Sequence, residues 1–413
     1  MAESASLNAF LARSHASILA AAAGASEQPV HVVLGNEAAD PDSCVCAIAL
    51  AAALDAGAER PLVAAPLIAV PRSDFKLQLD RVHLLRRAGL ANHGTSPDFA
   101  PAHVCFADEL DLSPLAARGL LRLHLVDHNK LAPALAHLAP CVASIIDHHA
   151  EEGLYTEGAP SGTASRHVEL GVGSCASLVA ERVRALAPSV LDDPATATLL
   201  LGAVLLDTVN LDPSKKPQKP REVGVADALL ATAAAQLGVA PSPAGRDAFF
   251  AELLRVKADT QQLLQFSTCD LLRMDYKEEA VPCPSARGSL APVGVGSVVL
   301  PLPLLLARQP AARLQDECAA YAVARGLRLL LLMSCDLGSS PPRRYLLMHC
   351  DEPALRATVL EKLRAADLRL TPLALDGEGG EGQGGDSLLA FTQDNYGLSR
   401  KVLMPVLRSL DAP

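Results

Sequence analysis

The chain has 413 residues, of which half are hydrophobic and only 3% aromatic, and its formal net charge is −10. This length exceeds one ordinary hydrophobic core, so we expect two globular domains, and the composition excludes a disordered protein. The acidic balance argues against a general affinity for nucleic acid or acidic membranes, because Lys and Arg drive such binding.

The start of the chain and its cysteines bear on the compartment. Residues 1–25 lack a charged segment followed by an uninterrupted apolar stretch, so we expect no secretory signal, while organellar targeting stays open. No window offers about 18 uninterrupted apolar residues, which predicts no membrane span. The ten cysteines are scattered without a CxxC spacing. They indicate free thiols in a reducing compartment, which favours the cytoplasm.

The first polar motif follows a short apolar segment, 30–34, that predicts a buried strand. It carries Asp40 and Asp42 and leads into the apolar segment 44–54, which predicts a helix. Two acids spaced i and i+2 between a strand and a helix can face one pair of cations. Ordinary capping of the helix by Asp42 or Ser43 is the alternative. A second strand is expected at 62–70, followed by a helix or loop at 74–85.

Two further apolar segments, 120–126 and 142–146, each end in a polar triplet. The triplets are Asp127-His128-Asn129 and Asp147-His148-His149. Parallel sheets place ligands beyond the carboxyl ends of their strands, so both triplets should emerge side by side. A lone Asp-His pair is usually a turn. Two carboxylates with three imidazoles need a positive partner, however, and a divalent cation is the usual one.

Two helices continue the first half of the chain. The helix expected at 171–187 opens with small residues around Ser174, whose exposed N–H groups suit a phosphate, although ordinary capping would explain them equally. The apolar helix expected at 195–206 ends in Asp207. An acid there is costly to bury without a partner, which makes Asp207 the candidate for the last metal ligand.

The middle of the chain holds the expected domain boundary. The basic, proline-rich segment 213–221 is most simply a solvated excursion, and a helix is expected at 222–237. The segment 238–245 contains two glycines and two prolines and is the best interdomain linker. We therefore expect an N-terminal extension at 1–27, a first domain at 28–237 and a second at 246–413.

The second half predicts another α/β unit with a mixed sheet. Its expected helices are 246–264, bearing Lys257, then 311–325 and 352–367, and its expected strands are 293–300, 327–333 and 345–349. The glycine- and acid-rich segment 377–385 predicts a mobile loop. Ser399-Arg400-Lys401 opens the final helix. Cations there oppose the helix dipole, which suggests a function, although plain surface charges are the alternative.

Together these motifs resemble the DHH phosphoesterase superfamily, in its branch with a second DHHA2 domain. This branch contains family II inorganic pyrophosphatases, eukaryotic exopolyphosphatases and prune-type proteins. Gly35-Asn36-Glu37 is similar to exopolyphosphatases and prune, and the complete Asp147-His148-His149 triplet most resembles yeast-type cytosolic exopolyphosphatases. The resemblance implies an α/β fold with an N-terminal parallel-sheet DHH domain, a smaller DHHA2 domain with a mixed sheet, and an active site in the cleft between them.

The resemblance also implies a reaction and residue roles. The reaction is hydrolysis of terminal phosphoanhydride bonds of inorganic polyphosphate, releasing orthophosphate, by a water that two divalent cations activate. Asp127 would bridge the cations and His149 would contact the phosphate under attack. The remaining metal ligands would be Asp40, with Asn36 nearby, for one cation and Asp42, His148 and Asp207 for the other. The phosphate oxygens would be bound by Lys257, Arg344, Arg400 and Lys401 of the second domain. Ser174 joins this set from the helix start described above.

The amide at Asn36 favours Mg²⁺ over Mn²⁺ or Co²⁺, because the related pyrophosphatases carry an imidazole at this position. Two departures from the family are visible: Gln78 stands where relatives carry Arg, and the spacing after Lys257 is longer.

Pyrophosphatase or short-chain nucleotide phosphohydrolase is the nearest alternative activity. A prune-like interaction protein with little activity is the alternative of another class. We expect a monomer that binds polyphosphate or pyrophosphate, and neither nucleic acid nor membrane.

Overall fold

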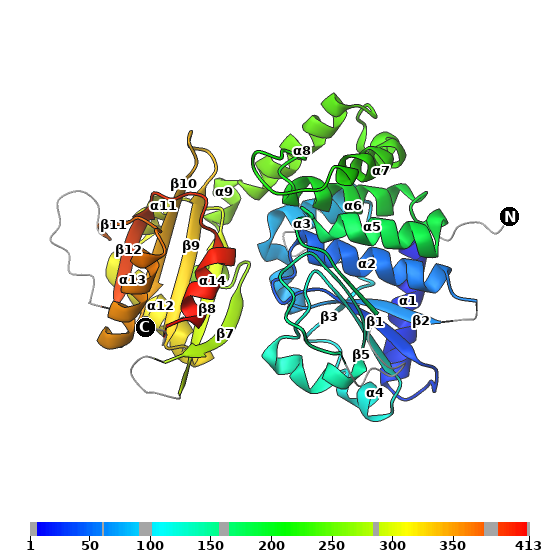
Figure 1. Ribbon diagram of the computed structural model, residues 1–413, viewed down its shortest axis with the longest axis horizontal. Helices are drawn as coiled ribbons and strands as arrows, with labels where there is room; N and C mark the ends of the chain where they lie inside the picture. Colours follow the sequence, from blue (N-terminus) through cyan, green and yellow to red (C-terminus); the bar gives the residue numbers. More distant parts are fainter. Residues whose placement is uncertain are drawn as a thin grey trace. The chain divides into compact units, whose positions relative to one another are not determined.

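The computed structural model describes residues 6–59, 62–90, 101–156, 165–283, 289–375 and 387–410. The chain divides into two compact units, Met1–Val256 and Lys257–Pro413, each built around its own sheet (Figure 1). The expected α/β class, with a parallel first sheet and a mixed second sheet, is confirmed. The expected mobile loop at 377–385 lies outside the described residues. No described helix is both long and apolar enough to cross a membrane.

The sheet of the first unit is parallel throughout, with strand order β3-β2-β1-β4-β5-β6. Because β1 pairs with β2 on one side and with β4 on the other, the strand order reverses there. Open α/β sheets bind ligands at such a point, beyond the carboxyl ends of the strands. The strands are β1 Val30–Leu34, β2 Val63–Ile68, β3 Cys105–Phe106, β4 Leu121–Val126, β5 Val142–Asp147 and β6 Ser165–Val168.

Helices cover both faces of this sheet, which explains why its strands are almost continuously apolar. Val33 and Val126 pack into the core beneath the larger helical layer, and Val32 and Leu125 pack into the core on the other face. The larger layer contains α2 Pro41–Ala56, α3 Leu79–Arg87, α5 Cys175–Leu186, α6 Pro194–Asp207, α7 Arg221–Leu237 and α8 Pro243–Lys257. The other face carries α1 Leu7–Ala22, α4 Ser113–Ala117 and the 3₁₀ segment Pro133–Cys141.

The expected N-terminal extension at 1–27 is wrong for its described part, because α1 is an integral element of the first unit. Leu11 and Ile18 are buried in its cores. The Ser14 hydroxyl donates a hydrogen bond to the Ala64 carbonyl on β2 at 2.6 Å, and the Leu7 N–H donates to Asp193 at 2.7 Å. Removing this helix would therefore expose core surface.

The boundary between the units also lies later than the expected linker at 238–245. That segment is the turn between α7 and α8: Gly238 ends α7 with a positive φ of 66°, and Pro243 begins α8. Phe249 and Leu253 on α8 are buried in the core of the first unit, which holds this helix there. The chain consequently passes to the second unit at Lys257.

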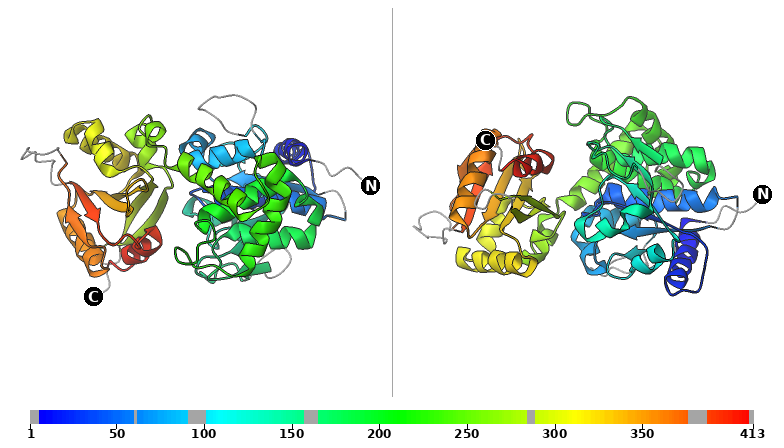
Figure 2. Two further views of the ribbon diagram at one scale, coloured as in Figure 1. Left: turned by 90° about the horizontal axis from the view of Figure 1, so that it is seen from above. Right: turned by 60° about the horizontal axis from the view of Figure 1, so that its bottom comes forward.

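The second unit has the strand order β11-β12-β10-β9-β8-β7, in which only the pairing of β8 with β9 is parallel. Helices α13 and α14 cover one face, and α10, α11 and α12 cover the other (Figure 2). The strands are β7 Lys277–Pro282, β8 Leu290–Val298, β9 Leu329–Asp336, β10 Arg343–His349, β11 Leu370–Pro372 and β12 Leu388–Gln393. The helices are α9 Thr260–Leu263, α10 Thr268–Leu272, α11 Leu302–Arg308, α12 Ala311–Arg325, α13 Pro353–Ala365 and α14 Arg400–Arg408.

Candidate metal centre

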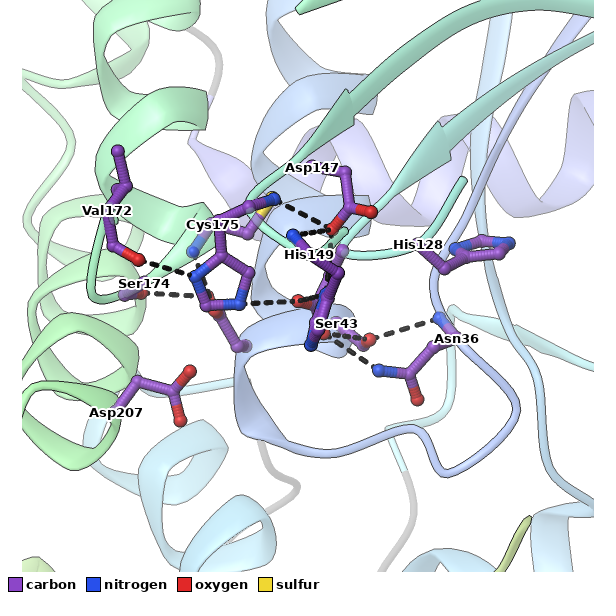
Figure 3. A network of polar contacts seen from close by, with 12 residues as sticks. Asn36, Ser43, His128, Asp147, His149, Val172, Ser174, Cys175 and Asp207 are labelled. Atoms are coloured by element: carbon purple, nitrogen blue, oxygen red, sulfur yellow. Dashed lines mark hydrogen bonds and ion pairs between the residues drawn. The ribbon is translucent and has the colours of Figure 1, made fainter. Parts of the chain in front are cut away.

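Acidic and imidazole side chains converge in the first unit where β1, β4 and β5 end (Figure 3). Two overlapping groups place one potential ligand atom per residue within 4.8 Å of one another. They are Asp127 with His148 and His149, and Asp42 with His148 and Asp207. The strand ends deliver the Asp-His triplets, Asp42 lies in the first turn of α2, and α6 ends at Asp207. These residues were expected to converge on one point, and in the structure they do.

The arrangement of Asp127 and His148 indicates a cation site. His148 Nδ1 faces the Val172 carbonyl oxygen at 3.0 Å and so carries a proton, and in the neutral ring Nε2 is then the electron-pair donor. Nε2 lies 3.3 Å from Asp127 Oδ1. Both atoms are buried, and within the described part of the chain neither makes a well-aligned hydrogen bond. Buried polar atoms are costly to leave unsatisfied, so this pair suits a shared metal ion.

The pKa shifts of the clustered side chains also indicate a cation site. Burial raises the pKa of Asp42, and the charges of Asp127 and Asp207 raise it further. Burial and the nearby Asp40 likewise raise the pKa of Asp127. For His148, burial lowers the pKa, but Asp127, Asp42 and Asp207 outweigh this effect and raise it to about 9. Such crowded acids need positive charge, and oxygen ligands with one or two imidazole nitrogens fit Mg²⁺ or Mn²⁺.

Asp42 is fixed by the beginning of α5. Its carboxylate accepts hydrogen bonds from the N–H groups of Cys175 and Ala176, both at 2.8 Å, and from the Ser174 hydroxyl at 3.0 Å. Ser174 was expected to bind phosphate, but it is fully buried and its hydroxyl is engaged by Asp42. In this structure the Ser174 hydroxyl positions Asp42, a candidate metal ligand, and the protein itself supplies the anion at this helix N-terminus.

A second buried carboxylate, that of Glu222, holds the loop that leads into α5. Glu222, in the first turn of α7, accepts hydrogen bonds from Gly173 N–H at 2.9 Å, the Ser177 hydroxyl at 2.9 Å and Lys219 N–H at 2.7 Å. Sequence reasoning missed Glu222, because an acid in the first turn of a helix normally needs no further explanation. No signal in the single sequence distinguishes it from a surface acid.

Asn36 positions the acids in this structure. Its Nδ2 donates to Asp127 Oδ2 at 2.8 Å and to Asp40 Oδ2 at 3.4 Å, while its Oδ1 accepts from Ala38 N–H at 2.9 Å. In this structure Asn36 therefore acts as a hydrogen-bond donor to both acids, and one backbone N–H orients its amide. Ser43 supports the same oxygen of Asp127 with a hydroxyl hydrogen bond of 2.7 Å.

The loop that carries Asn36 and Asp40 is held from outside by the start of α3. Gln78 Nε2 donates to the Ala38 carbonyl at 3.0 Å, and the buried Arg81 donates to the Ala39 carbonyl. Ala39 has a positive φ of 47°, an uncommon conformation that these two bonds stabilise. The departure at Gln78 therefore has a structural role in this chain.

His149 is oriented by Asp147. Its Nδ1 lies 2.8 Å from Asp147 Oδ1 and 3.7 Å from Asp127 Oδ1. Asp147 is fully buried, and Asn129 donates to its other oxygen at 2.6 Å. Burial opposes ionisation of Asp147, but the hydrogen bonds and charge of His149 and the Asn129 bond outweigh it and lower the pKa to about 2. An ionised carboxylate thus fixes the ring of His149, whereas His128 Nδ1 lies 2.9 Å from the Val126 carbonyl oxygen.

The expected phosphate-binding cations of the second unit lie in different local settings. Arg344 on β10 donates from Nε to the Tyr396 carbonyl at 2.7 Å and stacks over the Tyr396 ring at 4.7 Å. Arg400, at the beginning of α14, is paired with Asp275, its NH2 lying 2.7 Å from Oδ1. Lys257 lies close enough to Cys335 for its charge to lower the pKa of that thiol, which burial raises overall. Lys401 follows Arg400 on α14, and nothing is described of its side chain.

The geometry agrees with comparisons to known proteins. A family model of the DHHA2 domain matches residues 251–410. Exopolyphosphatase PRUNE1 of Rattus norvegicus is 34% identical over 388 residues, which cover 92% of this chain and 75% of the relative. The chain belongs to the exopolyphosphatase PRUNE1 family. The expected membership of the DHHA2 branch is thereby confirmed.

Two further relatives of this PRUNE1 family member extend the comparison. A Schizosaccharomyces pombe protein that carries the name exopolyphosphatase is 30% identical over 257 residues, covering 60% of this chain and 59% of its own. The crystal structure of a Methanococcus jannaschii family II inorganic pyrophosphatase matches with a TM-score of 0.58 and 18% identity. It covers 93% of this chain and 100% of its own, which shows a shared fold.

Proposed function

We propose that the protein is a metal-dependent exopolyphosphatase that hydrolyses terminal phosphoanhydride bonds of inorganic polyphosphate and releases orthophosphate. The observation that carries the proposal is the pair of buried, unsatisfied atoms Asp127 Oδ1 and His148 Nε2, which lie 3.3 Å apart. Three further acids, Asp40, Asp42 and Asp207, lie near this pair. Membership of the exopolyphosphatase PRUNE1 family supports the choice of substrate. The cofactors are two divalent cations, of which Mg²⁺ suits the oxygen-rich ligands best, with Mn²⁺ and Co²⁺ as alternatives.

The residues of the first unit have three roles: they bind the cations, contact the phosphate and position these side chains. Asp42, Asp127, His148 and Asp207, with Asp40 beside them, hold the cations. When bound, divalent cations lower the pKa of a water and neutralise charge on the phosphate. Asp147 and Asn129 fix the ring of His149, which we assign to the phosphate under attack. The N–H groups at the start of α5 hold the Asp42 carboxylate in place.

We also assign Lys257, Arg344, Arg400 and Lys401 of the second unit to the phosphate oxygens. In support, Arg344 is held by Tyr396 through Nε alone, and no bond to its terminal nitrogens is described in residues 289–375 and 387–410. A guanidinium fixed in this way presents a fork of donors that matches a phosphate. To bind a phosphate, Arg400 would release the Asp275 carboxylate or would use the N–H donors that do not bond to Asp275.

The test is phosphate release from long polyphosphate and from pyrophosphate, measured with Mg²⁺, Mn²⁺ or Co²⁺, together with product lengths over time. We expect orthophosphate from polyphosphate and shortening from the ends. Activity on pyrophosphate alone would favour a pyrophosphatase, to which the shared fold with the Methanococcus protein also corresponds. Absence of hydrolysis with every metal would favour an interaction protein.

The compartment is a separate proposal. None of the ten cysteines, all of which lie in the described part of the chain, forms a disulfide, and most are buried. Such thiols persist in a reducing environment, which supports the cytoplasm. Fractionation of cells expressing a tagged chain would test this.

A further inference from the structure

The basic segment 213–221 is largely exposed but is anchored beside the candidate metal centre. Gln218 Nε2 donates to the Leu211 carbonyl at 2.8 Å. The Pro217 carbonyl oxygen would lie 3.2 Å from a Cβ added at Gly173, so the segment closely covers the loop that leads to Ser174. Glu222 ties both together, since it accepts from Gly173 N–H and from Lys219 N–H. The segment is therefore anchored to the same loop that positions Asp42.

Lys216 is the cation of this segment that faces the metal centre. Its Nζ lies 4.0 Å from Oδ1 of Asp207, and its side chain is 43% exposed. Arg221 is engaged elsewhere, because its guanidinium lies 2.5 Å from Glu169 and 3.0 Å from Glu181. Lys215 contributes charge near Asp212. The two adjacent lysines thus differ in direction, and only Lys216 pairs with a candidate metal ligand among the described residues.

Stability does not explain the place of Lys216. An ion pair as exposed as this one contributes only about 0–1 kcal/mol, because water screens it. A positive charge beside Asp207 also repels the cation that Asp207 would bind, which weakens metal binding. When a substrate with several negative charges is bound, its attraction to Lys216 outweighs the repulsion between Lys216 and the cation. Once its terminal phosphate lies at the cations, the following phosphates need positive partners of their own.

We infer that Lys216 binds phosphate groups of the substrate beyond the one under attack, and that it favours polyphosphate chains over pyrophosphate. The inference rests on the proposed function. A Lys ammonium presents three donors on a flexible stem, so it can follow a chain of phosphates without a fixed geometry. The anchored segment would hold it at the edge of the metal centre, in the same unit as the metal ligands.

The decisive variant is Lys216→Gln, with Lys215→Gln as the matched control. For Lys216→Gln we expect the KM for long polyphosphate to rise about tenfold, the typical effect of one charge-assisted hydrogen bond, with kcat within about twofold. The KM for pyrophosphate should change less than about threefold. Lys215→Gln should match the wild type, and Lys216→Arg should restore most of the affinity.

Two direct binding measurements separate this inference from its alternatives. Titration calorimetry with Mn²⁺ measures metal affinity without turnover. If Lys216 only offsets Asp207, Lys216→Gln will bind Mn²⁺ more tightly and leave the KM unchanged, which overturns the inference. If the wild type hydrolyses nothing, the proposed function fails by itself. Calorimetry with Mg²⁺ and long polyphosphate then decides, and equal affinity in wild type and Lys216→Gln overturns the role of Lys216 as well.

Discussion

The Asp147 carboxylate and the His149 ring form a hydrogen bond of 2.8 Å between Oδ1 and Nδ1. The same oxygen accepts the N–H of His148 at 2.8 Å and that of His149 at 3.2 Å. One buried carboxylate therefore fixes both the backbone that presents the two imidazoles and the orientation of one ring. Partners of this kind set the tautomer and direction of a functional histidine.

Replacing Asp147 should accordingly impair hydrolysis without removing a metal ligand. Asp147→Asn keeps the volume but removes the charge that fixes His149, so we expect kcat/KM to fall about 10- to 100-fold. Steady-state kinetics at saturating Mg²⁺ measure this. Asp111→Asn is the control, because Asp111 is exposed and its one bond within the described residues is to its neighbour Ser113. A kcat/KM within about twofold of the wild type would contradict the positioning role.

Asp127 should behave differently with and without metal. Asp127→Asn suits the positive φ of 62° at this position, since Asn tolerates that conformation well. In the presence of a chelator, we expect a higher thermal midpoint than for the wild type, because burial and Asp40 disfavour the charge of Asp127. With Mg²⁺ added, the variant should gain little stability, and hydrolysis should be lost.

Differential scanning calorimetry with chelator and with excess Mg²⁺ checks both parts of this prediction. A ligand at about 100 times its Kd stabilises the native state by about 2.7 kcal/mol, which is easily detected for the wild type. Circular dichroism confirms that the variant is folded. If Mg²⁺ stabilises Asp127→Asn as much as the wild type, Asp127 is not a ligand.

Gly35 should be intolerant of any side chain, because α2 passes close to the end of β1. A Cβ at this position would lie 2.8 Å from Ser43 Cβ and 2.9 Å from the Ser43 carbonyl oxygen. Gly35→Ala must therefore push Ser43 away from Asp127, to which its hydroxyl donates at 2.7 Å. We expect a loss of about 1–3 kcal/mol of unfolding free energy, together with weaker Mn²⁺ binding.

The control for Gly35→Ala is Gly224→Ala on α7, where an added Cβ meets no atom within 4 Å. This change should stabilise the protein by up to about 1 kcal/mol, because Gly is a poor helix residue. Urea unfolding followed by circular dichroism measures both variants. Equal stability of Gly35→Ala and the wild type would mean that the close approach of α2 is not required.

The convergence of the candidate metal ligands was predictable because their positions follow from chain order. The strand expected at 30–34 matches β1, and the strands expected before Asp127 and Asp147 match β4 and β5 to within one residue. In a parallel sheet, residues after neighbouring strands must meet at one edge. The identity of the strands therefore predicted the contact between the two triplets, without knowledge of any side-chain geometry.

The supporting residues were not predictable in this way. Ser174 and Glu222 have roles that depend on which helix start lies against which carboxylate, and that is set by tertiary packing. The same holds for Lys216, whose direction depends on how the segment 213–221 folds back. The helix α1 was missed because its sequence is rich in Ala and does not distinguish a buried face from an exposed one. The buried face becomes clear only in the structure, where α1 packs against β2. Residues whose partners are distant in the sequence show no local sequence pattern that would reveal their role.

His124 should make the stability of the first unit depend on pH. Burial and the nearby His31 and Arg182 lower its pKa from 6.5 to about 3, and it is enclosed by His31 at 2.9 Å and the Ser144 hydroxyl at 2.7 Å. The folded state keeps this imidazole neutral, whereas the unfolded chain takes up a proton below about pH 6.5. The stabilisation is therefore complete above pH 6.5 and is lost as the pH falls toward 3.

The variant that tests this is His124→Gln, which can still bond to Ser144 and does not titrate. Between about pH 6.5 and pH 5, the wild type should lose about 2 kcal/mol more unfolding free energy than the variant, because each pKa unit corresponds to about 1.4 kcal/mol. Urea unfolding in chelator at both pH values measures the difference. The lowered pKa of His31 persists in the variant and cancels in the comparison. Parallel losses in the two proteins would show that His124 is already protonated in the folded state, or that its partners move to accommodate the charge.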